Sequence, residues 1–384
     1  MAETIIEFIS ILLTTAYLVI VISFIRGWNR LETPAPPSRD PTTRISVLIA
    51  ARDEEATIGR CLDAILAQRY PVELLEVIVI DDHSTDRTAA FVNSYTGPQT
   101  DPVRPAVRLI RMNEHKPINS YKKKAIARGI GEAWGELIVT TDADCWMGPD
   151  WLRTIATAYE RHGYKLISSP VGFAEENSLF ERLQTLEFMY LIGLGASAIG
   201  NAFPSTCNGA NLAYTREVFF QVDGFKGIDD LASGDDELLL HKVAALYYNK
   251  IGFIKSRDAI VYTHAKTSLK EFLSQRKRWA SKSIKYRNKL VVALGLSVYF
   301  FNVFVLLTGC LALFNFNFAP LFLGMFGSKL AVEIVFLYFL SRFMGRLPLL
   351  IWMPVLSLLH VVYMVYIGLA GQQRSYQWKG RRVK

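Results

Sequence analysis

Four long apolar stretches constrain the fold of this chain more than any other feature of its sequence. The first covers residues 5–25, and three more cover residues 290–314, 319–340 and 348–370. Each is close to the roughly 20 apolar residues that a helix needs to cross a bilayer. The part between them, roughly 250 residues of mixed polarity, is long enough to bury a core of its own. The sequence therefore predicts a globular domain held between membrane helices.

The first apolar stretch has the flanks of a membrane anchor rather than those of a cleaved leader. Glu3 and Glu7 precede or open it, and its basic residues, Arg26 and Arg30, come after it, whereas a leader begins with basic residues. The positive-inside rule places the chain after such an anchor in the cytoplasm. We therefore expect an anchor at residues 1–30, a linker at 31–44, and a protein of the bacterial inner (plasma) membrane with its globular domain in the cytoplasm.

Charge and cysteine content narrow the range of partners. The formal net charge is +8, but the basic residues gather beside the apolar stretches, so we expect anionic lipids and no nucleic acid as partners. The four cysteines are far apart, and they show neither the spacing of a zinc site nor the pairing of a secreted disulfide framework. A reducing compartment fits this pattern.

The first half of the globular domain alternates between short β-type runs and helical patterns. Strands are expected at residues 45–51, 75–80, 107–110 and 137–141, and helices at 56–68, 84–92 and 122–134. Such alternation predicts an α/β fold with a mainly parallel sheet and helices on both faces.

Pairs of carboxylates come directly after two of the expected strands. Asp81 and Asp82 follow the second strand, and Asp142 and Asp144 follow the fourth. Ligands of such sheets bind outside the carboxyl ends of the strands, where these acids would repel one another unless a cation lay among them. A divalent cation that holds a phosphate fits, although each pair by itself is as typical of a turn.

The ordered motifs of the middle resemble those of the family 2 glycosyltransferases, whose nucleotide-sugar-binding fold is called GT-A. The motifs are ISVLIAARDEEATIGRCLDAILAQRYP, VIVIDDHSTDRT, KKKAIARGIGEAWGELIVTTDAD, GANLAYTREVF, SGDDELL and QRKRW. They cover residues 46–279, and their order makes the resemblance specific. It implies a GT-A domain at residues 45–267 and a hexosyltransferase activity.

The resemblance also implies a donor site. Asp81 or Asp82 would contact the nucleotide, Lys124 would lie near uracil and phosphate, and Asp142 and Asp144 would hold the diphosphate through Mg²⁺ or Mn²⁺. Glu54, in the first motif, and Asn211, in the loop beside the sugar, are expected to bind the donor as well. The sequence departs from the usual pattern at Asp53, where asparagine is common, and at His83, where glycine is common.

The GDDE motif is expected to supply the general base. Asp236 matches the usual base and Asp235 precedes it, and direct attack by the acceptor hydroxyl would invert the anomeric centre. Acids at this position also favour the start of a helix, which is the alternative interpretation.

Gln275, Arg278 and Trp279 lie at offsets of three and four residues, on one face of an expected helix. An amide, a planar cation and an indole suit a diphosphate and a sugar at an acceptor site. Residues 270–289 also carry eight Lys or Arg and one acid, which is typical of a helix lying on an anionic membrane. We expect such an interfacial helix at 268–289 to serve both purposes.

The membrane segments bear on the acceptor and on topology. A membrane region at 290–372 offers little polar lining for a polysaccharide tunnel, which favours a lipid acceptor.

Three spans after a cytoplasmic domain would put the basic tail, 373–384, outside, against the positive-inside rule. One segment is therefore expected to be re-entrant or interfacial, and the middle one is suspected because Lys329 and Glu333 lie inside it and are spaced to pair.

These features together predict a membrane-bound, metal-dependent, inverting glycosyltransferase that moves a sugar from a nucleotide sugar, with a lean towards UDP, to a lipid. A processive polysaccharide synthase and a polyprenyl-phosphate glycosyltransferase are the alternatives within the enzyme class. A catalytically silent membrane scaffold is the alternative outside it.

Overall fold

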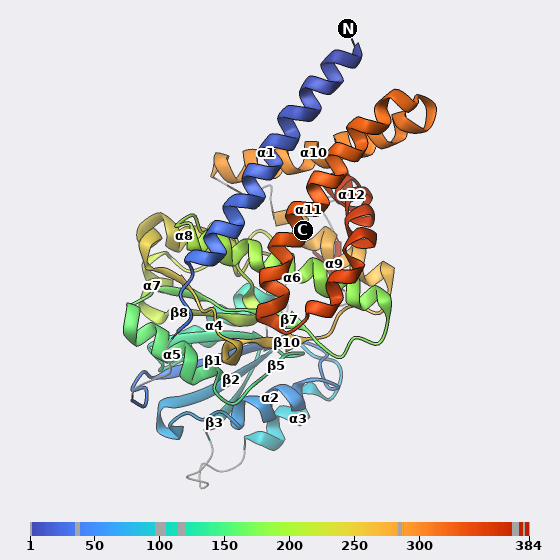
Figure 1. Cartoon of the computed structure of the whole chain (residues 1–384). Coiled ribbons are helices and arrows are strands. Elements are labelled where there is room, and N and C mark those ends of the chain that lie inside the picture. Colours follow the sequence, from blue (N-terminus) through green and yellow to red (C-terminus); the bar gives the residue numbers. More distant parts are fainter. Residues whose placement is uncertain are drawn as a thin grey trace. The chain divides into compact units, whose positions relative to one another are not determined.

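A computed structural model describes residues 2–34, 39–96, 105–113, 120–282, 286, 288–370, 376–378 and 381–383 (Figure 1). The chain forms two compact units. We call residues 30–175, 198–264 and 375–384 the sheet unit, and residues 1–29, 176–197 and 265–374 the helical unit. Three basic residues of the expected tail, Arg374, Lys379 and Lys384, lie outside the described residues.

The sheet unit is built on a mainly parallel sheet. Within the described residues this sheet has seven strands in the order β3-β2-β1-β4-β8-β6-β9. Their bounds are β1 Ile45–Ala51, β2 Leu75–Asp81, β3 Ala106–Arg111, β4 Leu137–Asp142, β6 Leu166–Ser168, β8 Leu212–Thr215 and β9 Ile251–Phe253. The first four in spatial order run parallel to one another, and β8 is antiparallel to both of its neighbours. This confirms the α/β fold predicted from the alternating pattern.

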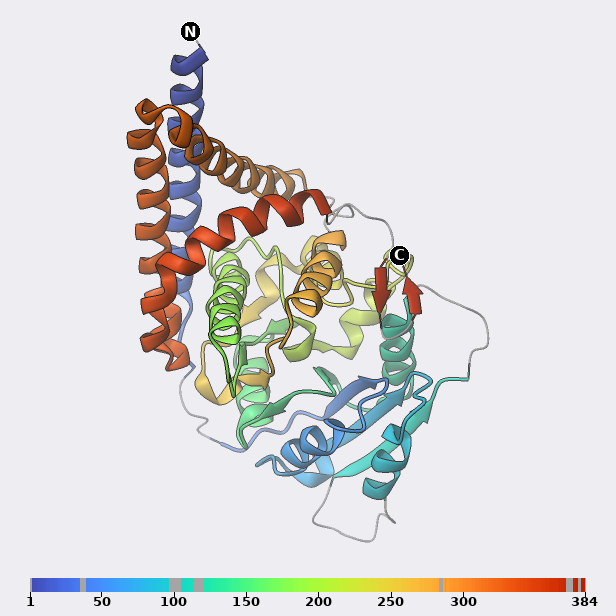
Figure 2. The same ribbon diagram turned by 90° about the vertical axis from the view of Figure 1, so that its right-hand side faces the viewer.

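The helices between the parallel strands cover both faces of the sheet. In Figure 2, α2 (Ile58–Leu66) and α3 (Thr88–Tyr95) lie on one face and α4 (Tyr121–Glu132) on the other. Helix α3 begins four residues later than predicted, because residues 84–87 form a hydrogen-bonded turn with the loop after β1.

The strand register brings the carboxylates to one edge of the sheet. Ala51 of β1 is level with Asp81 of β2, and Ala50 is level with Asp142 of β4. Every residue of β2 is buried, so the polar residues that come after it mark the point where the chain leaves the core. The prediction that both acidic pairs fall at the same edge of the sheet is confirmed, with β1 between the two strands that they follow.

The rest of the sheet unit consists of a smaller sheet and several helices and short strands. A smaller sheet of β5 (Trp146–Met147), β10 (Val261–Thr263) and β7 (Val171–Phe173) follows the second acidic pair. The remaining elements are η1 (Val72–Leu74), α5 (Trp151–His162), η2 (Gly209–Asn211), α7 (Arg216–Gln221), α8 (Glu237–Tyr247), η3 (Tyr248–Lys250), η4 (Arg257–Ala259), and the strands β11 (Tyr376–Trp378) and β12 (Arg381–Val383), which pair with each other.

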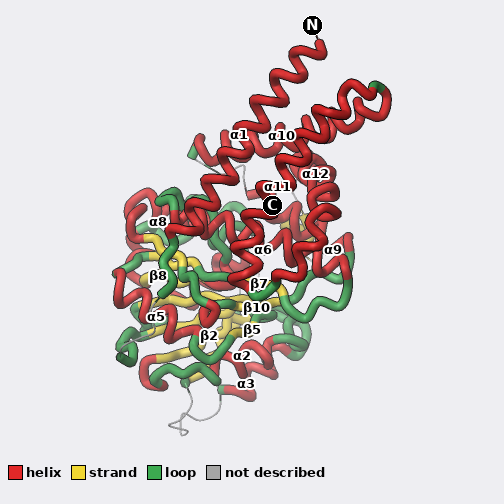
Figure 3. Tube along the Cα trace, in the orientation of Figure 1, coloured by secondary structure: helices red, strands yellow, loops and turns green. Residues whose placement is uncertain are grey.

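The helical unit contains the long apolar helices, and the described strands, yellow in Figure 3, all belong to the sheet unit. Its elements are α1 (Ala2–Arg30), most of α6 (Leu179–Gly200), α9 (Leu269–Ser281), α10 (Lys289–Phe314), η6 (Phe316–Phe318), α11 (Ala319–Met344), η7 (Leu347–Trp352) and α12 (Met353–Ala370). In the described part of the chain, four helical segments, at residues 3–30, 289–314, 316–344 and 347–370, are long and apolar enough to cross a membrane. The expected interfacial helix is shorter than predicted, since α9 ends at Ser281; residues 283–285 and 287 lie outside the described residues.

Helices α1 and α11 run side by side in the same direction. Tyr17 donates a hydrogen bond to Glu333 at 2.5 Å. Further along both helices, the rings of Phe24 and Phe336 lie 6.0 Å apart, and those of Trp28 and Phe343 lie 5.3 Å apart. Because the residue numbers rise together along both helices, the two helices are parallel rather than antiparallel.

The predicted pairing of Lys329 with Glu333 is confirmed. The ammonium of Lys329 lies 2.7 Å from both carboxylate oxygens of Glu333, and it also donates to the hydroxyl of Ser357 on α12 at 3.0 Å. Lys329 is completely buried and Glu333 almost so. Each charge is therefore compensated inside the unit, as an ionisable group at membrane depth requires.

Breaking this pair from one side is expected to cost more than removing both charges. Lys329→Met leaves the Glu333 carboxylate buried without its cation, which costs about 3–5 kcal/mol, whereas Lys329→Met combined with Glu333→Leu leaves no unpaired charge. Thermal unfolding in detergent measures both, with Lys270→Met on the exposed part of α9 as the control. A double variant less stable than the single one would contradict this account.

Candidate functional site

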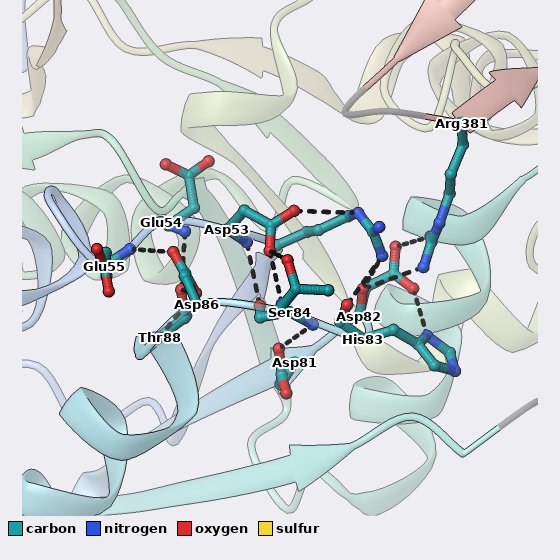
Figure 4. Close-up of polar contacts among 12 residues, drawn as sticks. Asp53, Glu54, Glu55, Asp81, Asp82, His83, Ser84, Asp86, Thr88 and Arg381 are labelled. Atoms are coloured by element: carbon teal, nitrogen blue, oxygen red, sulfur yellow. Dashed lines mark hydrogen bonds and ion pairs between the residues drawn. The ribbon is translucent and has the colours of Figure 1, made fainter.

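The loops after β1 and β2 interlock at the edge of the sheet, as Figure 4 shows. The hydroxyl of Ser84 accepts from the amide of Asp53 at 3.1 Å, and Asp53 in turn accepts from the amide of Thr85 at 2.7 Å. One step further along, Asp86 accepts from the amide of Glu55 at 3.0 Å. The first two motifs of the sequence therefore form one rigid substructure.

The two departures from the usual motifs lie at left-handed backbone positions of this substructure. Asp53 has a φ of 50° and His83 a φ of 59°. Aspartate and histidine are among the residues that adopt this region more readily than most side chains. The common glycine at the position of His83 is thereby explained, because the turn requires a positive φ there.

The two acids after β2 differ in their surroundings. Asp81 accepts from the amide of Ser84 at 3.1 Å and thereby shapes the turn. Asp82 has its Oδ1 3.0 Å from Nδ1 of His83 and its Oδ2 2.8 Å from Nη1 of Arg381, and only 3% of it is exposed. Arg381 comes from strand β12, and the sequence analysis did not single it out.

Glu54 lies in the loop between β1 and α2, four residues before α2 begins. Its carboxylate accepts from the hydroxyl of Thr57 at 2.9 Å, and its amide donates to the hydroxyl of Thr88 at 2.8 Å. It is partly exposed beside the two interlocked loops, and its predicted contact with the donor stays a prediction.

The second acidic pair is joined to the GDDE motif by one lysine. The ammonium of Lys122 lies 2.7 Å from Oδ1 of Asp142 and 3.2 Å from Oδ2 of Asp235. Burial by itself lowers the pKa of Lys122, but the carboxylates of Asp142 and Asp235 outweigh it and raise that pKa well above its usual range. A permanent positive charge therefore lies between the two acidic motifs.

The three consecutive lysines at the start of α4 point in different directions. Lys123 is buried and donates to the carbonyls of Ile228, Leu231 and Ser233 at 2.6–2.7 Å, which ties down the loop before GDDE. Its burial lowers its pKa to about 8. Lys124 is exposed. The lysine that the structure brings to the carboxylates is therefore Lys122; the role predicted for Lys124 stays a prediction.

Asp236 is held by two backbone amides. It caps α8, where its Oδ1 accepts from the amide of Glu237 at 2.6 Å, and its Oδ2 accepts from the amide of Gly209 at 3.1 Å. A methyl group added at Gly209 would meet Asp235 at 3.3 Å, so the backbone approaches both acids closely there. Asp236 therefore does stabilise the start of a helix, as the alternative interpretation of the motif held. Its role as the general base stays a prediction.

Asn211 lies behind the site rather than at its surface. Its side chain is completely buried, donates to the carbonyls of Pro170 and Ala259 at 2.7 Å each, and accepts from the indole of Trp151 at 2.9 Å. In this arrangement its amide fixes the loop that carries Gly209, and its predicted contact with the donor stays a prediction.

The sheet edge fits a divalent cation by the chemistry of its donors. Asp142 and Asp144 supply hard oxygen ligands at one turn, and 40% of the Asp142 side chain is exposed. Mg²⁺ binds through one or two carboxylates plus substrate phosphates, so a third protein ligand is not required. Among the residues that the structure describes, no group of three or more His, Cys, Asp or Glu forms such a site.

Gln275, Arg278 and Trp279 lie on one face of α9, in the helical unit, as their spacing predicts. Between them is a buried residue that the sequence analysis did not use. Arg276 donates to the two carboxylate oxygens of Glu187 on α6 through Nε and Nη2, and its guanidinium lies 4.3 Å from the ring centroid of Trp279. The sequence did not show which of the three consecutive basic residues, Arg276, Lys277 and Arg278, would anchor α9 to α6.

A second cluster near the acids also went unnoticed in the sequence. The guanidinium of Arg60 lies 3.6 Å above the ring of Trp146 and pairs with Glu175 at 2.7 Å. The ring of His264 lies 4.8 Å from that of Trp146. These residues come from separate segments, and only the fold brings them together.

The chain matches two family models. The model described as Glycosyl transferase family 2 matches residues 46–220, and the one described as Glycosyl transferase family group 2 matches residues 137–370. Together these spans include both acidic pairs, the GDDE motif and α9.

Individual proteins support the same assignment. The probable glycosyltransferase YdaM of Bacillus subtilis is 27% identical over 341 residues, which are 87% of this chain and 76% of YdaM. The beta-monoglucosyldiacylglycerol synthase of Synechocystis is 28% identical over 127 residues, which are 32% of this chain but only 25% of the synthase.

One solved structure extends the likeness to the fold. Mannosyltransferase PcManGT from Pyrobaculum calidifontis, in complex with GDP-Man and Mn²⁺, matches 92% of this chain and 99% of its own length, with a TM-score of 0.59 and 20% identity. Because the second family model alone spans more than half of the sequence, the chain belongs to the family 2 glycosyltransferases and is a glycosyltransferase of the GT-A fold.

Proposed function

We propose that this enzyme transfers a sugar, with inversion, from a nucleotide sugar to a lipid acceptor on the cytoplasmic face of the bacterial inner membrane. The observation that carries the proposal is the placement of Lys122 between Asp142 and Asp235, because it joins the expected diphosphate-binding acids to the expected catalytic motif. Four membrane-type helical segments in the described chain and the glycolipid product in the name of the Synechocystis relative support a lipid acceptor.

The donor's diphosphate would be held at the second acidic pair. Asp142 and Asp144 would bind Mg²⁺ or Mn²⁺, and such an ion neutralises charge that develops on the departing nucleotide. The Mn²⁺ named with PcManGT supports a divalent ion without deciding between the two metals. Lys122 keeps Asp142 in place and adds a positive charge next to the phosphates.

The acceptor's proton would pass to Asp236. The acceptor oxygen forms a bond to the anomeric carbon while the bond from that carbon to the diphosphate breaks, and the carboxylate takes the proton of the hydroxyl. Asp235 is less suited to this step because its Oδ2 already lies 3.2 Å from the ammonium of Lys122. The amides of Gly209 and Glu237 fix the orientation of Asp236.

The nucleotide end would lie at Asp81 and Asp82, with Glu54 beside them. We propose UDP as the nucleotide, because the motifs favour it. Gln275, Arg278 and Trp279 are proposed to contact the acceptor and the diphosphate, and the basic face of α9 to lie on anionic lipids.

A lipid acceptor needs no tunnel through the protein, because it reaches the enzyme from within the leaflet. A processive polysaccharide synthase would need a continuous polar channel, and a polyprenyl-phosphate acceptor would make a base at Asp236 less necessary. A transfer assay distinguishes the lipid acceptor from both of these and from a catalytically silent scaffold.

The purified protein is expected to move labelled sugar into lipid. Detergent-solubilised enzyme is incubated with Mg²⁺ or Mn²⁺, a panel of radiolabelled nucleotide sugars and a membrane-lipid extract, and the label is partitioned between organic solvent and water. Asp236→Asn is expected to slow transfer by about 10²–10⁴-fold, the usual contribution of a general base. Asp144→Asn and metal chelation are expected to abolish most of the transfer.

Other distributions of the label would point elsewhere. Label only in large water-soluble or insoluble material would mean a processive synthase. Label in an acid-labile lipid phosphate, with Asp236→Asn fully active, would mean a polyprenyl-phosphate acceptor. If no sugar were transferred from any donor to any fraction, the catalytically silent membrane scaffold would be the remaining interpretation.

Lys122 and Lys124 offer a matched pair of substitutions, since they lie two residues apart on one helix. Lys122→Met removes a charge-assisted bond to Asp142 and is expected to lower kcat/KM by about 30-fold, equivalent to about 2 kcal/mol. Lys124→Met is expected to lower it less than about threefold. The reverse order of the two losses would restore Lys124 as the donor lysine.

A further inference from the structure

The C-terminal hairpin belongs to the sheet unit although the helical unit lies between them in the sequence. Strand β12 carries Arg381, whose Nη1 lies 2.8 Å from Oδ2 of Asp82 and whose Nη2 donates to the carbonyl oxygen of Asp82 at 3.4 Å (Figure 4). The same guanidinium lies 3.7 Å above the ring of Tyr121. Three contacts therefore fix one side chain of the tail.

This ion pair is not an ordinary surface contact. The side chain of Arg381 is 16% exposed and that of Asp82 only 4%. Exposed pairs contribute little because water and salt screen them, whereas a shielded carboxylate depends on its cation. Arg381 also fits this place by shape, since a guanidinium can stack on an aromatic ring with its face while it donates with its edge.

We propose that Arg381 is a positioning residue for the nucleotide end of the donor site, and that the C-terminal hairpin is part of that site. The inference rests on the proposed function, in which Asp82 lies at the nucleotide. Arg381 holds one oxygen of Asp82 and His83 lies against the other, so the carboxylate has a fixed orientation. Its charge is also compensated, which reduces its repulsion of the donor's diphosphate.

The contact with Tyr121 extends this effect along α4. Tyr121 is the first residue of that helix and directly precedes Lys122, which holds Asp142. Arg381 therefore links the acid after β2 to the helix that carries the lysine of the second acidic pair. Loss of Arg381 is expected to affect binding of the nucleotide more than the chemical step.

The test is nucleotide binding by the full-length protein in detergent. UDP, GDP, CDP and TDP are titrated calorimetrically with Mn²⁺ present. Arg381→Ala is expected to raise the Kd of the preferred nucleotide about tenfold and to leave kcat at saturating donor within about twofold. Arg381→Lys restores the charge without the planar fork and should recover only part of the affinity.

Two controls separate this role from general damage to the tail. Arg382→Ala makes the same change of charge one residue further along and is expected to keep the wild-type Kd. The double variant Asp82→Asn with Arg381→Ala is expected to bind no more weakly than Asp82→Asn alone, because Arg381 acts through Asp82.

The outcomes are distinct. An unchanged or lower Kd for Arg381→Ala overturns the proposal, and a lower one would mean that the tail competes with the nucleotide. A wild-type protein that binds none of the four nucleotides would instead remove the proposed donor site itself.

A second observation, within the helical unit, concerns which helices cross the membrane. Arg346, between α11 and α12, lies 3.4 Å from Glu176, three residues after β7 of the sheet unit. Near the other end of α12, the ring of Tyr363 packs on Phe272 of α9, and the ammonium of Lys277 lies 5.1 Å from the ring centroid of Tyr366. Helix α9 begins six residues after β10. The connection between α11 and η7 therefore contacts the segment after β7, and the second half of α12 contacts α9, the first helix after β10.

We infer that α12 does not cross the membrane and that α1, α10 and α11 do. Helix α11 runs parallel to α1, as two successive crossings by α10 and α11 after the sheet unit require. This places the tail on the side of the sheet unit, where its basic residues satisfy the positive-inside rule. The expected non-crossing segment is thus the last of the three rather than the middle one that Lys329 and Glu333 made suspect.

Labelling of single introduced cysteines tests this topology. In a background with Cys207→Ser and Cys310→Ser, Asn317→Cys is expected to react with a membrane-impermeant maleimide from outside intact cells. Leu347→Cys and Lys384→Cys are expected to react only after the membrane is permeabilised. Reaction of Lys384→Cys from the same side as Asn317→Cys would overturn the inference.

Discussion

The site depends on the balance between carboxylates crowded at one edge of a sheet and the cations that reach them. The register of β1, β2 and β4 places Asp81 and Asp142 at strand ends on either side of β1. Such a concentration of negative charge would resist both folding and the approach of a diphosphate. Lys122 and Arg381 offset it, each from a different part of the chain. Asp142 stays partly exposed, which suits the divalent ion proposed to bind there.

Local patterns were sufficient to predict the framework. The β-branched runs at residues 45–51 and 75–80 correspond to β1 and β2 because a strand buried on both faces needs continuous apolar sequence. The acids were predicted at one edge because parallel strands end on the same side. The pairing of Lys329 with Glu333 followed from a four-residue spacing, which brings side chains together on any helix.

Contacts between distant segments were beyond such reasoning. Three consecutive lysines have the same chemistry, and only the packing of α4 shows that Lys123 is buried and that Lys122 faces the acids. Asn211 belongs to a motif associated with the donor, yet its buried amide serves Trp151 and two carbonyls. The sequence analysis treated Arg381 only as part of the basic tail, because nothing in its neighbourhood points to a partner 299 positions earlier.

The position of Arg381 in the sequence ties the proposed nucleotide end of the site to a segment that follows all four apolar helices. Asp82 is synthesised before any of the last three apolar helices, and its cation only after all of them. The tail reaches Asp82 only if an even number of helices crosses the membrane after residue 264, which α10 and α11 provide when α12 stays on one side. A fragment that ends before α10 would keep both acidic pairs, Lys122 and Asp236, but it would leave the shielded carboxylate of Asp82 without its arginine. Under the proposed function, the chain that follows the helical unit therefore returns to the sheet edge, where Arg381 completes the proposed donor site.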